Sequence, residues 1–164
     1  MKKFWIQVFL LVSGTFLVLY FSFNKQFEDF SLLSTSSQSF DYSTLKVGEV
    51  MLNIEIADTP NKRSKGLSGR PSLPLDSGML FIFPEEKKYQ FWMKGVEFPL
   101  DFIFIKDGKV VDIINNATPP SGNQKDAALT IYSPSMPIDS MLEVNGGVVS
   151  SSGIKVGDLV TLRK

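Results

Sequence analysis

The feature that most limits the fold of this chain is a series of short apolar segments with strand-like periodicity, separated by glycine and proline turns, from residue 47 onward. In VMLNIEIAD, residues 50–58, alternate residues are aliphatic, which is the pattern of a half-buried strand. GMLFIF, residues 78–83, is apolar throughout, and Pro84 is expected to end it. Many short strands with little helix predict a mainly β domain, built as a small sandwich or a partly closed barrel.

Local turn and cap signals place the connections between these strands. An Asp-Gly pair at 107–108 separates two β-branched runs, which is the strongest short-range signal for a hairpin. The Asp-Thr-Pro step at 58–60 supplies an N-cap and a proline for the first helical turn, so we expect one short helix over 60–66. Other expected elements are strands at 102–105, 110–114 and 141–144, a polar loop at 115–126, and a last strand after the turn at 157–158.

An uncharged apolar run precedes the β domain at residues 4–23. As a helix, twenty residues span about 30 Å, the thickness of the hydrocarbon core of a bilayer, so residues 1–23 are expected to form a membrane anchor with a transmembrane helix at 4–23. A cleaved signal peptide is the alternative. It needs a shorter apolar region that ends in small residues, whereas the small residues 13–15 lie in the middle of this run.

Basic residues set the expected orientation of the anchor. Lys2 and Lys3 precede the apolar run and should stay in the cytoplasm, which sends the rest of the chain across the membrane. A Ser-rich composition makes 24–46 a flexible linker, and 47–164 is the expected β domain. The chain is therefore predicted to be a single-pass protein of the cell membrane, with its β domain on the extracytoplasmic side.

The chain has no cysteine and no histidine, which excludes several kinds of chemistry. Disulfides, a cysteine nucleophile, a Ser-His-Asp triad and zinc sites built from thiolates or imidazoles all require one of these residues. The 17 basic and 17 acidic residues balance and no basic stripe is present, so no nucleic-acid partner is expected. No acidic loop of the EF-hand type occurs, so we expect no metal, and the sequence indicates no cofactor.

Six sequence blocks follow one another in order along the β domain. They are IADTPNKRSKGLSGR (56–70), LPLDSGMLFIF (73–83), FWMKGVEFPLDFIFI (91–105), DGKVV (107–111), LEVNGG (142–147) and GIKVGD (153–158). These blocks resemble domain-of-unknown-function family 192 over about residues 47–163. The resemblance implies a compact, mainly β domain with one short helix, commonly carried behind a signal or membrane anchor in prokaryotes, and it implies no reaction. The family usually has Asn-Thr after FWMK, where this chain has Gly95 and Val96, so a function that needs those polar groups would be altered here.

Five polar or amphipathic residues lie among apolar neighbours and are the candidates for a binding site: Arg70, Trp92, Lys94, Asp101 and Glu143. If the fold brings them together, they would line a pocket for a small anionic or sugar-like ligand, with bidentate contacts from Arg70 and a stacking surface on Trp92. The structural alternative pairs Arg70 with Asp101 or Glu143 as an internal ion pair, because buried charges persist when they are paired. For Trp92, burial in the core is the favoured interpretation.

The leading functional hypothesis is a membrane-tethered module that binds a small ligand or a partner protein of the cell envelope. The alternative is a hydrolase that uses Asp101 and Glu143, since a carboxylate pair can hydrolyse glycosides when its members are roughly 5 to 9.5 Å apart. A purely structural interaction module is the third hypothesis, and an exposed apolar patch would be its sign.

Overall fold

The computed structural model describes residues 43–120 and 129–163 of the 164-residue chain. Within these two ranges, no helix is both long enough and apolar enough to cross a bilayer. The predicted transmembrane helix at 4–23 and most of the predicted linker at 24–46 lie outside the described residues.

Seven strands form one sheet, in the order β5-β4-β6-β3-β2-β1-β7. They are β1 (Ser43–Val47), β2 (Val50–Ala57), β3 (Ser77–Lys87), β4 (Leu100–Lys106), β5 (Lys109–Ala117), β6 (Ile138–Asn145) and β7 (Val160–Arg163). Strands β2 and β3 pair in parallel, whereas the other neighbouring strands are antiparallel. The predicted mainly β class is confirmed.

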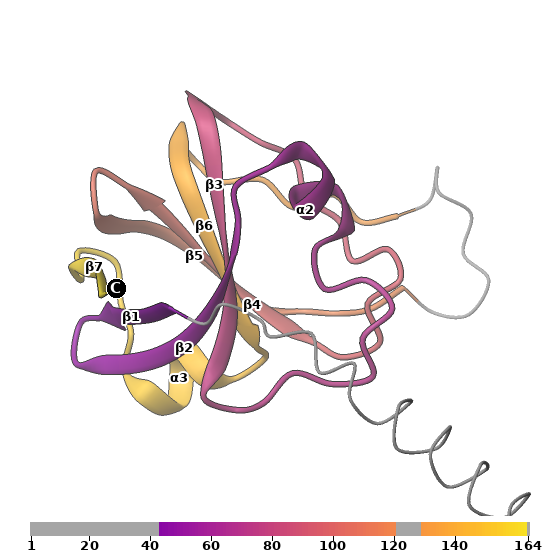
Figure 1. Cartoon of the computed structure of the whole chain (residues 1–164), viewed down its shortest axis with the longest axis horizontal. Coiled ribbons are helices and arrows are strands. Elements are labelled where there is room, and N and C mark those ends of the chain that lie inside the picture. Colours follow the sequence, from indigo (N-terminus) through magenta and orange to yellow (C-terminus); the bar gives the residue numbers. More distant parts are fainter. Residues whose placement is uncertain (1–42, 121–128, 164) are drawn as a thin grey trace, which may run out of the picture. The chain divides into compact units, whose positions relative to one another are not determined.

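The sheet coils so that its two ends approach each other (Figure 1). At the start of β5, the amide of Val110 donates to the carbonyl of Asp158 at 2.9 Å, and in β7 the amide of Val160 donates to the carbonyl of Gly108 at 2.8 Å. These bonds join the two outer strands along a short seam. Of the two predicted architectures, the structure therefore has the partly closed barrel.

Strand residues alternate between two apolar cores, one on each face of the sheet. The inner core takes aliphatic side chains from all seven strands, so it fills the barrel. The outer core is rich in Phe and Met and is covered by the segments that connect α2 (Pro60–Lys65) to β3 and β3 to β4. On β4, Phe102 and Phe104 belong to the outer core, whereas Ile103 and Ile105 belong to the inner core.

The predicted hairpin and the predicted helix are both confirmed. Asp107 and Gly108 have positive φ angles of 50° and 67°, which the tight turn between β4 and β5 requires. Helix α2 begins with Pro60, and the side chain of Thr59 caps it by accepting from the amide of Lys62 at 3.3 Å. A second helix of a single turn, α3 (Val148–Ser152), follows β6 and was not predicted.

Strands β3, β4, β5 and β6 extend beyond their predicted limits, and β1 was not predicted. Strand β1 begins at Ser43, inside the predicted linker, because Leu45 and Val47 pack in the inner core despite the polar composition around them. Strand β3 continues past Pro84. At this point β2 has already ended, opposite Phe81, and the pairing with β6 is irregular after Ile82. The N–H that proline lacks is therefore not needed for a hydrogen bond between strands. Strand β5 runs to Ala117, three residues into the predicted loop at 115–126.

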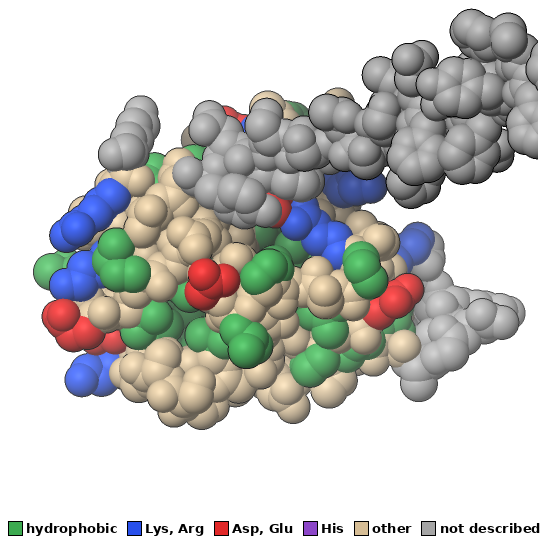
Figure 2. Space-filling view, turned by 60° about the horizontal axis from the view of Figure 1, so that its bottom comes forward, with side chains coloured by type: hydrophobic (Ala, Val, Ile, Leu, Met, Phe, Trp, Pro, Cys, Tyr) green, Lys and Arg blue, Asp and Glu red, His purple; other side chains and the backbone are tan. Residues whose placement is uncertain are grey.

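Figure 2 shows one face of the molecule, on which hydrophobic side chains lie between polar and charged ones, and basic and acidic groups are mixed. Large apolar side chains that are exposed in the described part of the chain come from several elements, for example Leu75, Ile131 and Leu159. Scattered apolar residues of this kind are normal on a protein surface, so they do not indicate a single docking patch.

Candidate functional site

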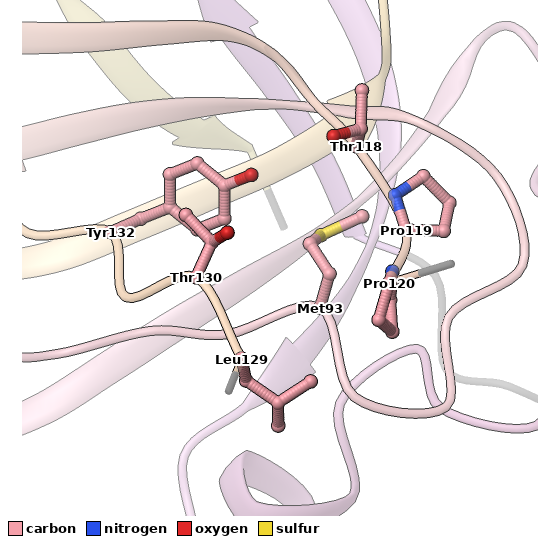
Figure 3. Close-up of a pocket in the computed structure, with 7 residues that line it drawn as sticks. All are labelled: Met93, Thr118, Pro119, Pro120, Leu129, Thr130 and Tyr132. Carbon is pink, nitrogen blue, oxygen red and sulfur yellow. The ribbon is translucent and has the colours of Figure 1, made fainter. Parts of the chain in front are cut away.

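One hollow lies between the loop that follows β5 and the loop that precedes β6 (Figure 3). It has a volume of about 330 Å³ and is lined by Met93, Thr118, Pro119, Pro120, Leu129, Thr130 and Tyr132. Its only ionisable lining side chain among the described residues is Tyr132. Because Pro120 and Leu129 flank residues 121–128, which the structure does not describe, we assign no site to this hollow.

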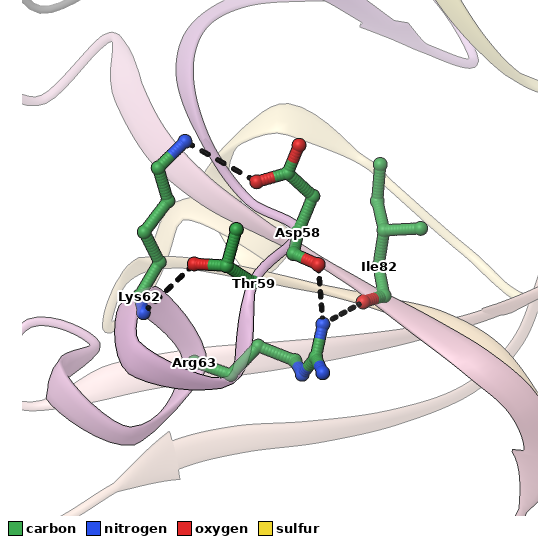
Figure 4. Close-up of polar contacts among 5 residues, drawn as sticks. All are labelled: Asp58, Thr59, Lys62, Arg63 and Ile82. Atoms are coloured by element: carbon green, nitrogen blue, oxygen red, sulfur yellow. Dashed lines mark hydrogen bonds and ion pairs between the residues drawn. The ribbon is translucent and has the colours of Figure 1, made fainter.

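Helix α2 is fixed to the sheet by Arg63 (Figure 4). One nitrogen of its guanidinium group donates to the carbonyl of Asp58 at 2.7 Å and to the carbonyl of Ile82 in β3 at 2.9 Å. The ammonium of Lys62 contacts the Asp58 carboxylate at 3.2 Å, and this hydrogen bond lowers the pKa of Asp58. Together these contacts hold α2 against the outer half of β3.

A groove opens between the C-terminal end of α2, the outer half of β3 and the segment 89–96. Its volume is about 490 Å³, a size suited to a small organic ligand. Aromatic side chains make up much of the wall, and Phe83 and Tyr89 stack there with ring centroids 4.0 Å apart. Its rim carries four basic side chains and one exposed carboxylate, which are Arg63, Lys65, Lys87, Lys94 and Glu85.

Glu143 contributes the most unusual group in the groove. It lies on β6 between Met79 of β3 and Phe102 of β4, and only 8% of its surface is exposed. In the part of the chain that the structure describes, its carboxyl group makes neither a hydrogen bond nor an ion pair. Burial therefore raises the pKa of Glu143 to about 8, so the carboxyl is mostly protonated at neutral pH and can donate a hydrogen bond.

Trp92 does not belong to the core, so the interpretation favoured from the sequence is wrong. Its side chain is 54% exposed and lines the groove, whereas the next residue, Met93, is only 3% exposed and packs in the outer core. The chain turns here, with the amide of Val96 bonded to the carbonyl of Met93 at 3.2 Å, and this turn directs Met93 inward. Lys94 is exposed and also lines the groove.

Arg70 forms its ion pair with a residue that the sequence did not indicate. Its guanidinium makes a bidentate contact with the Glu55 carboxylate, and the Nη2–Oε2 distance is 2.7 Å. The predicted pairing with Asp101 or Glu143 is therefore wrong. Glu55, Met79 and Glu143 occupy one row across β2, β3 and β6, so the ion pair lies two strands, or about 10 Å, from Glu143.

The sequence missed Glu55 because it occupies the polar position of an alternating strand, where exposure to solvent is the usual outcome. In the structure both faces of β2 are covered, and Glu55 is 9% exposed. No local signal identifies its partner, since Arg70 follows 15 residues later, beyond α2.

Asp101 lies on the opposite face of the sheet from Glu143. It is completely buried and accepts three backbone hydrogen bonds, from Asn116 at 2.8 Å, Gly147 at 3.0 Å and Val149 at 2.9 Å. The register pairs Asp101 with Val144, so its side chain and that of Glu143 alternate to different faces. This contradicts the catalytic pair that was predicted from Asp101 and Glu143, and it identifies Asp101 as a structural clamp between β4, β5 and α3.

Of the two positions that depart from the family's usual Asn-Thr pair, Val96 lines the groove and Gly95 precedes it in the chain. Gly95 has a φ of 71°, and a Cβ atom there would lie 2.2 Å from the hydroxyl of Ser68. Val96 is buried and packs in the outer core. Where the family usually has two polar side chains, this chain therefore has a glycine that leaves no room for a side chain beside Ser68, followed by a buried valine.

No group of three acidic side chains within the described ranges is close enough to hold a metal ion. Of the five candidate residues, Trp92, Lys94 and Glu143 line one groove. Arg70 is held in its ion pair with Glu55 and does not line the groove, and Asp101 lies on the other face of the sheet. The candidate site is therefore the groove, with Glu143 at its base.

Comparisons with known proteins agree with this architecture. Residues 43–162 match the sequence model of the family DUF192, described as "Uncharacterized ACR". A protein of unknown function from Novosphingobium aromaticivorans DSM 12444 is 30% identical, with a TM-score of 0.68 over 77% of this chain and 89% of that one. A "putative transcription regulator" from Sinorhizobium meliloti 1021 is also 30% identical, with a TM-score of 0.67 over 77% of this chain and 98% of that one. No curated protein matches the chain.

Proposed function

The chain belongs to the DUF192 family, and we propose that its β domain binds a small ligand in the groove between α2, β3 and the segment 89–96. The observation that carries this proposal is Glu143, a buried carboxyl without a polar partner among the described residues, at the base of that groove. No side-chain oxygen of the described residues is both fully buried and without a hydrogen-bond partner, so the Glu143 oxygens reach the groove, where a ligand can bond to them.

Trp92 supports the same proposal. Large aromatic side chains usually bury most of their surface, yet more than half of this one is exposed beside a hollow. An indole in this position offers a flat apolar surface on which a ligand can stack. The predicted anchor at 4–23 would hold the module at the extracytoplasmic face of the cell membrane.

Binding is favoured over hydrolysis because Glu143 has no suitable carboxylate partner in the described groove. Glu85 is the other carboxylate of the lining, but it is six residues from Met79 on β3, or about 20 Å along the strand. Glycoside hydrolysis requires a separation of roughly 5 to 9.5 Å. Glu55 is nearer, but Arg70 holds both of its oxygens.

The name of the Sinorhizobium relative refers to transcription, but the charge of this chain does not favour a nucleic-acid partner. Equal numbers of basic and acidic residues give no net positive charge, whereas binding to nucleic acid relies on an excess of lysine and arginine at the contact surface. The proposal therefore concerns a small ligand.

Fluorescence of Trp92 tests the proposal directly. The chain has two tryptophans, so a Trp5→Phe variant of the full chain in detergent makes Trp92 the sole reporter. We expect members of a library of envelope sugars and metabolites to change its emission and to raise the melting temperature. A Trp92→Ala variant should lose the thermal response, whereas Leu75→Ala, which alters an exposed side chain outside the groove, should keep it. Equal responses of all variants to every compound would refute a site in this groove.

A further inference from the structure

We propose that the groove selects a small carboxylate with a flat apolar body, and that the carboxyl group of Glu143 donates a hydrogen bond to the carboxylate of that ligand. This inference rests on the proposed function and narrows it to one chemical class. Its basis is the combination of a basic rim, an aromatic wall and a buried acid in one groove.

The charge of the rim favours an anion. Lys87 pairs with Glu85 at 2.5 Å, so these two charges largely cancel. Arg63 bonds to two carbonyl groups, and neither it nor Lys65 contacts a carboxylate among the described residues. A groove with unbalanced positive charge at its mouth attracts anions and repels cations, most strongly at low ionic strength.

The buried acid favours a ligand that accepts a hydrogen bond. Protonated Glu143 has one O–H donor, and an ionised carboxylate is the strongest acceptor that a small organic ligand can offer. A cationic ligand would instead require Glu143 to be ionised, and the basic rim opposes its entry. The aromatic wall, with the stacked pair of Phe83 and Tyr89 and the exposed face of Trp92, suits a flat apolar body.

The surroundings of Glu143 identify the groups that set its charge. On the strands beside it are Met79 and Phe102, which are apolar, and the ion pair of Glu55 and Arg70 lies one strand beyond Met79. The other charged or titratable groups that line the groove are Arg63, Lys65, Glu85, Lys87, Tyr89 and Lys94. A change of pH that ionises Glu143 removes the donor and places a second negative charge beside the ligand.

The test compares matched probes of one shape and three charges: benzoate, benzyl alcohol and benzylamine, together with their naphthalene analogues. Binding is followed by Trp92 fluorescence in the Trp5→Phe full-length chain in detergent. We expect the carboxylates to bind best, with an affinity that falls about tenfold between pH 7 and pH 9 as Glu143 loses its proton. The Glu143→Gln variant keeps an N–H donor, so it should bind the carboxylates with little dependence on pH.

A charge reversal on the rim gives an independent readout. Lys65→Glu should weaken carboxylate binding by roughly fivefold at low ionic strength, whereas Lys155→Glu, the same change at an exposed site that does not line the groove, should leave it unaltered. Preference for the amine or the alcohol, or carboxylate binding that is equally independent of pH in wild type and Glu143→Gln, would overturn this inference and leave the proposed function standing. No response of Trp92 to any probe or library compound would overturn both.

Discussion

Two of the three buried carboxyl groups of the sheet, Asp101 and Glu143, lie on adjacent strands and have opposite surroundings. Asp101 on β4 faces the inner core and accepts hydrogen bonds from three backbone amides. Glu143 on β6 faces the outer core, at the base of a groove, and burial alone determines its pKa. Both residues are acidic interruptions of apolar strands in the sequence. Both acids are buried, so burial alone does not distinguish their roles. An acid whose hydrogen bonds are all made within the protein has a structural role, whereas one without such partners can bind a ligand.

The largest effect is expected from Asp101→Ala. The substitution leaves the amides of Asn116 in β5, Gly147 before α3 and Val149 in α3 without an acceptor in the interior, so we expect the free energy of unfolding to fall by about 4 kcal/mol. Urea denaturation of the full chain in detergent measures the change. Asp101→Asn, which keeps one acceptor oxygen, should lose about half as much. A loss below about 1 kcal/mol for the alanine variant would remove the structural role assigned to Asp101.

Unlike Asp101, Glu143 should lower the stability of the folded protein, by an amount that depends on pH. The folded chain holds its proton up to about pH 8, whereas the unfolded chain releases it near the ordinary value of 4.5. The folded state therefore binds more protons between these values, and stability falls as pH rises through this window, by about 1.4 kcal/mol per unit. From pH 5.5 to 7.5 the loss is about 3 kcal/mol, fully developed above the folded pKa.

Glu143→Gln should abolish this dependence and be the more stable protein at pH 7.5. The difference between the two denaturation series isolates Glu143 from other titrating groups. If the wild type and the variant lose stability in parallel as the pH rises, then Glu143 is not held protonated, and its contrast with Asp101 disappears.

The smallest effect on stability is expected at Trp92. Because its side chain is half exposed, Trp92→Ala should change the free energy of unfolding by less than about 1 kcal/mol. Met93→Ala, one residue away but buried in the outer core, should cost about 3 kcal/mol. Thermal or urea denaturation of the two variants measures both changes. A larger loss of stability in Trp92→Ala than in Met93→Ala would contradict the outward orientation of Trp92 and the inward orientation of Met93.

Local patterns in the sequence were sufficient to predict the elements that are determined by residues close to one another in the chain. The hairpin at 107–108 needs two residues with positive φ, and Asp-Gly supplies them. Helix α2 needs a cap and a proline in its first turn, and both are adjacent in the chain. Strand β1 and the outer half of β3 were missed because pairing across the sheet, and not local composition, makes them strands.

The candidate site was only partly predictable for the same reason. Trp92, Lys94 and Glu143 could be chosen as polar or amphipathic residues in apolar surroundings, and the fold does bring them to one groove. Which face each acid occupies depends on the register between β4 and β6, whose residues are about 40 positions apart. The partner of Arg70 depends on a long-range contact with Glu55, which no short motif records.

The pairing of β1 with β7 has a consequence for how the domain is made. Strand β1 can pair with β7 only after β7 has been synthesised. The segment that contains β7 also forms the seam with β5. While a ribosome is still adding β7, the aliphatic interior of the barrel has one side open to water. Completion of the domain therefore follows synthesis of its final residues, and the non-local pairing makes this a comparatively slow step during which aggregation competes with folding.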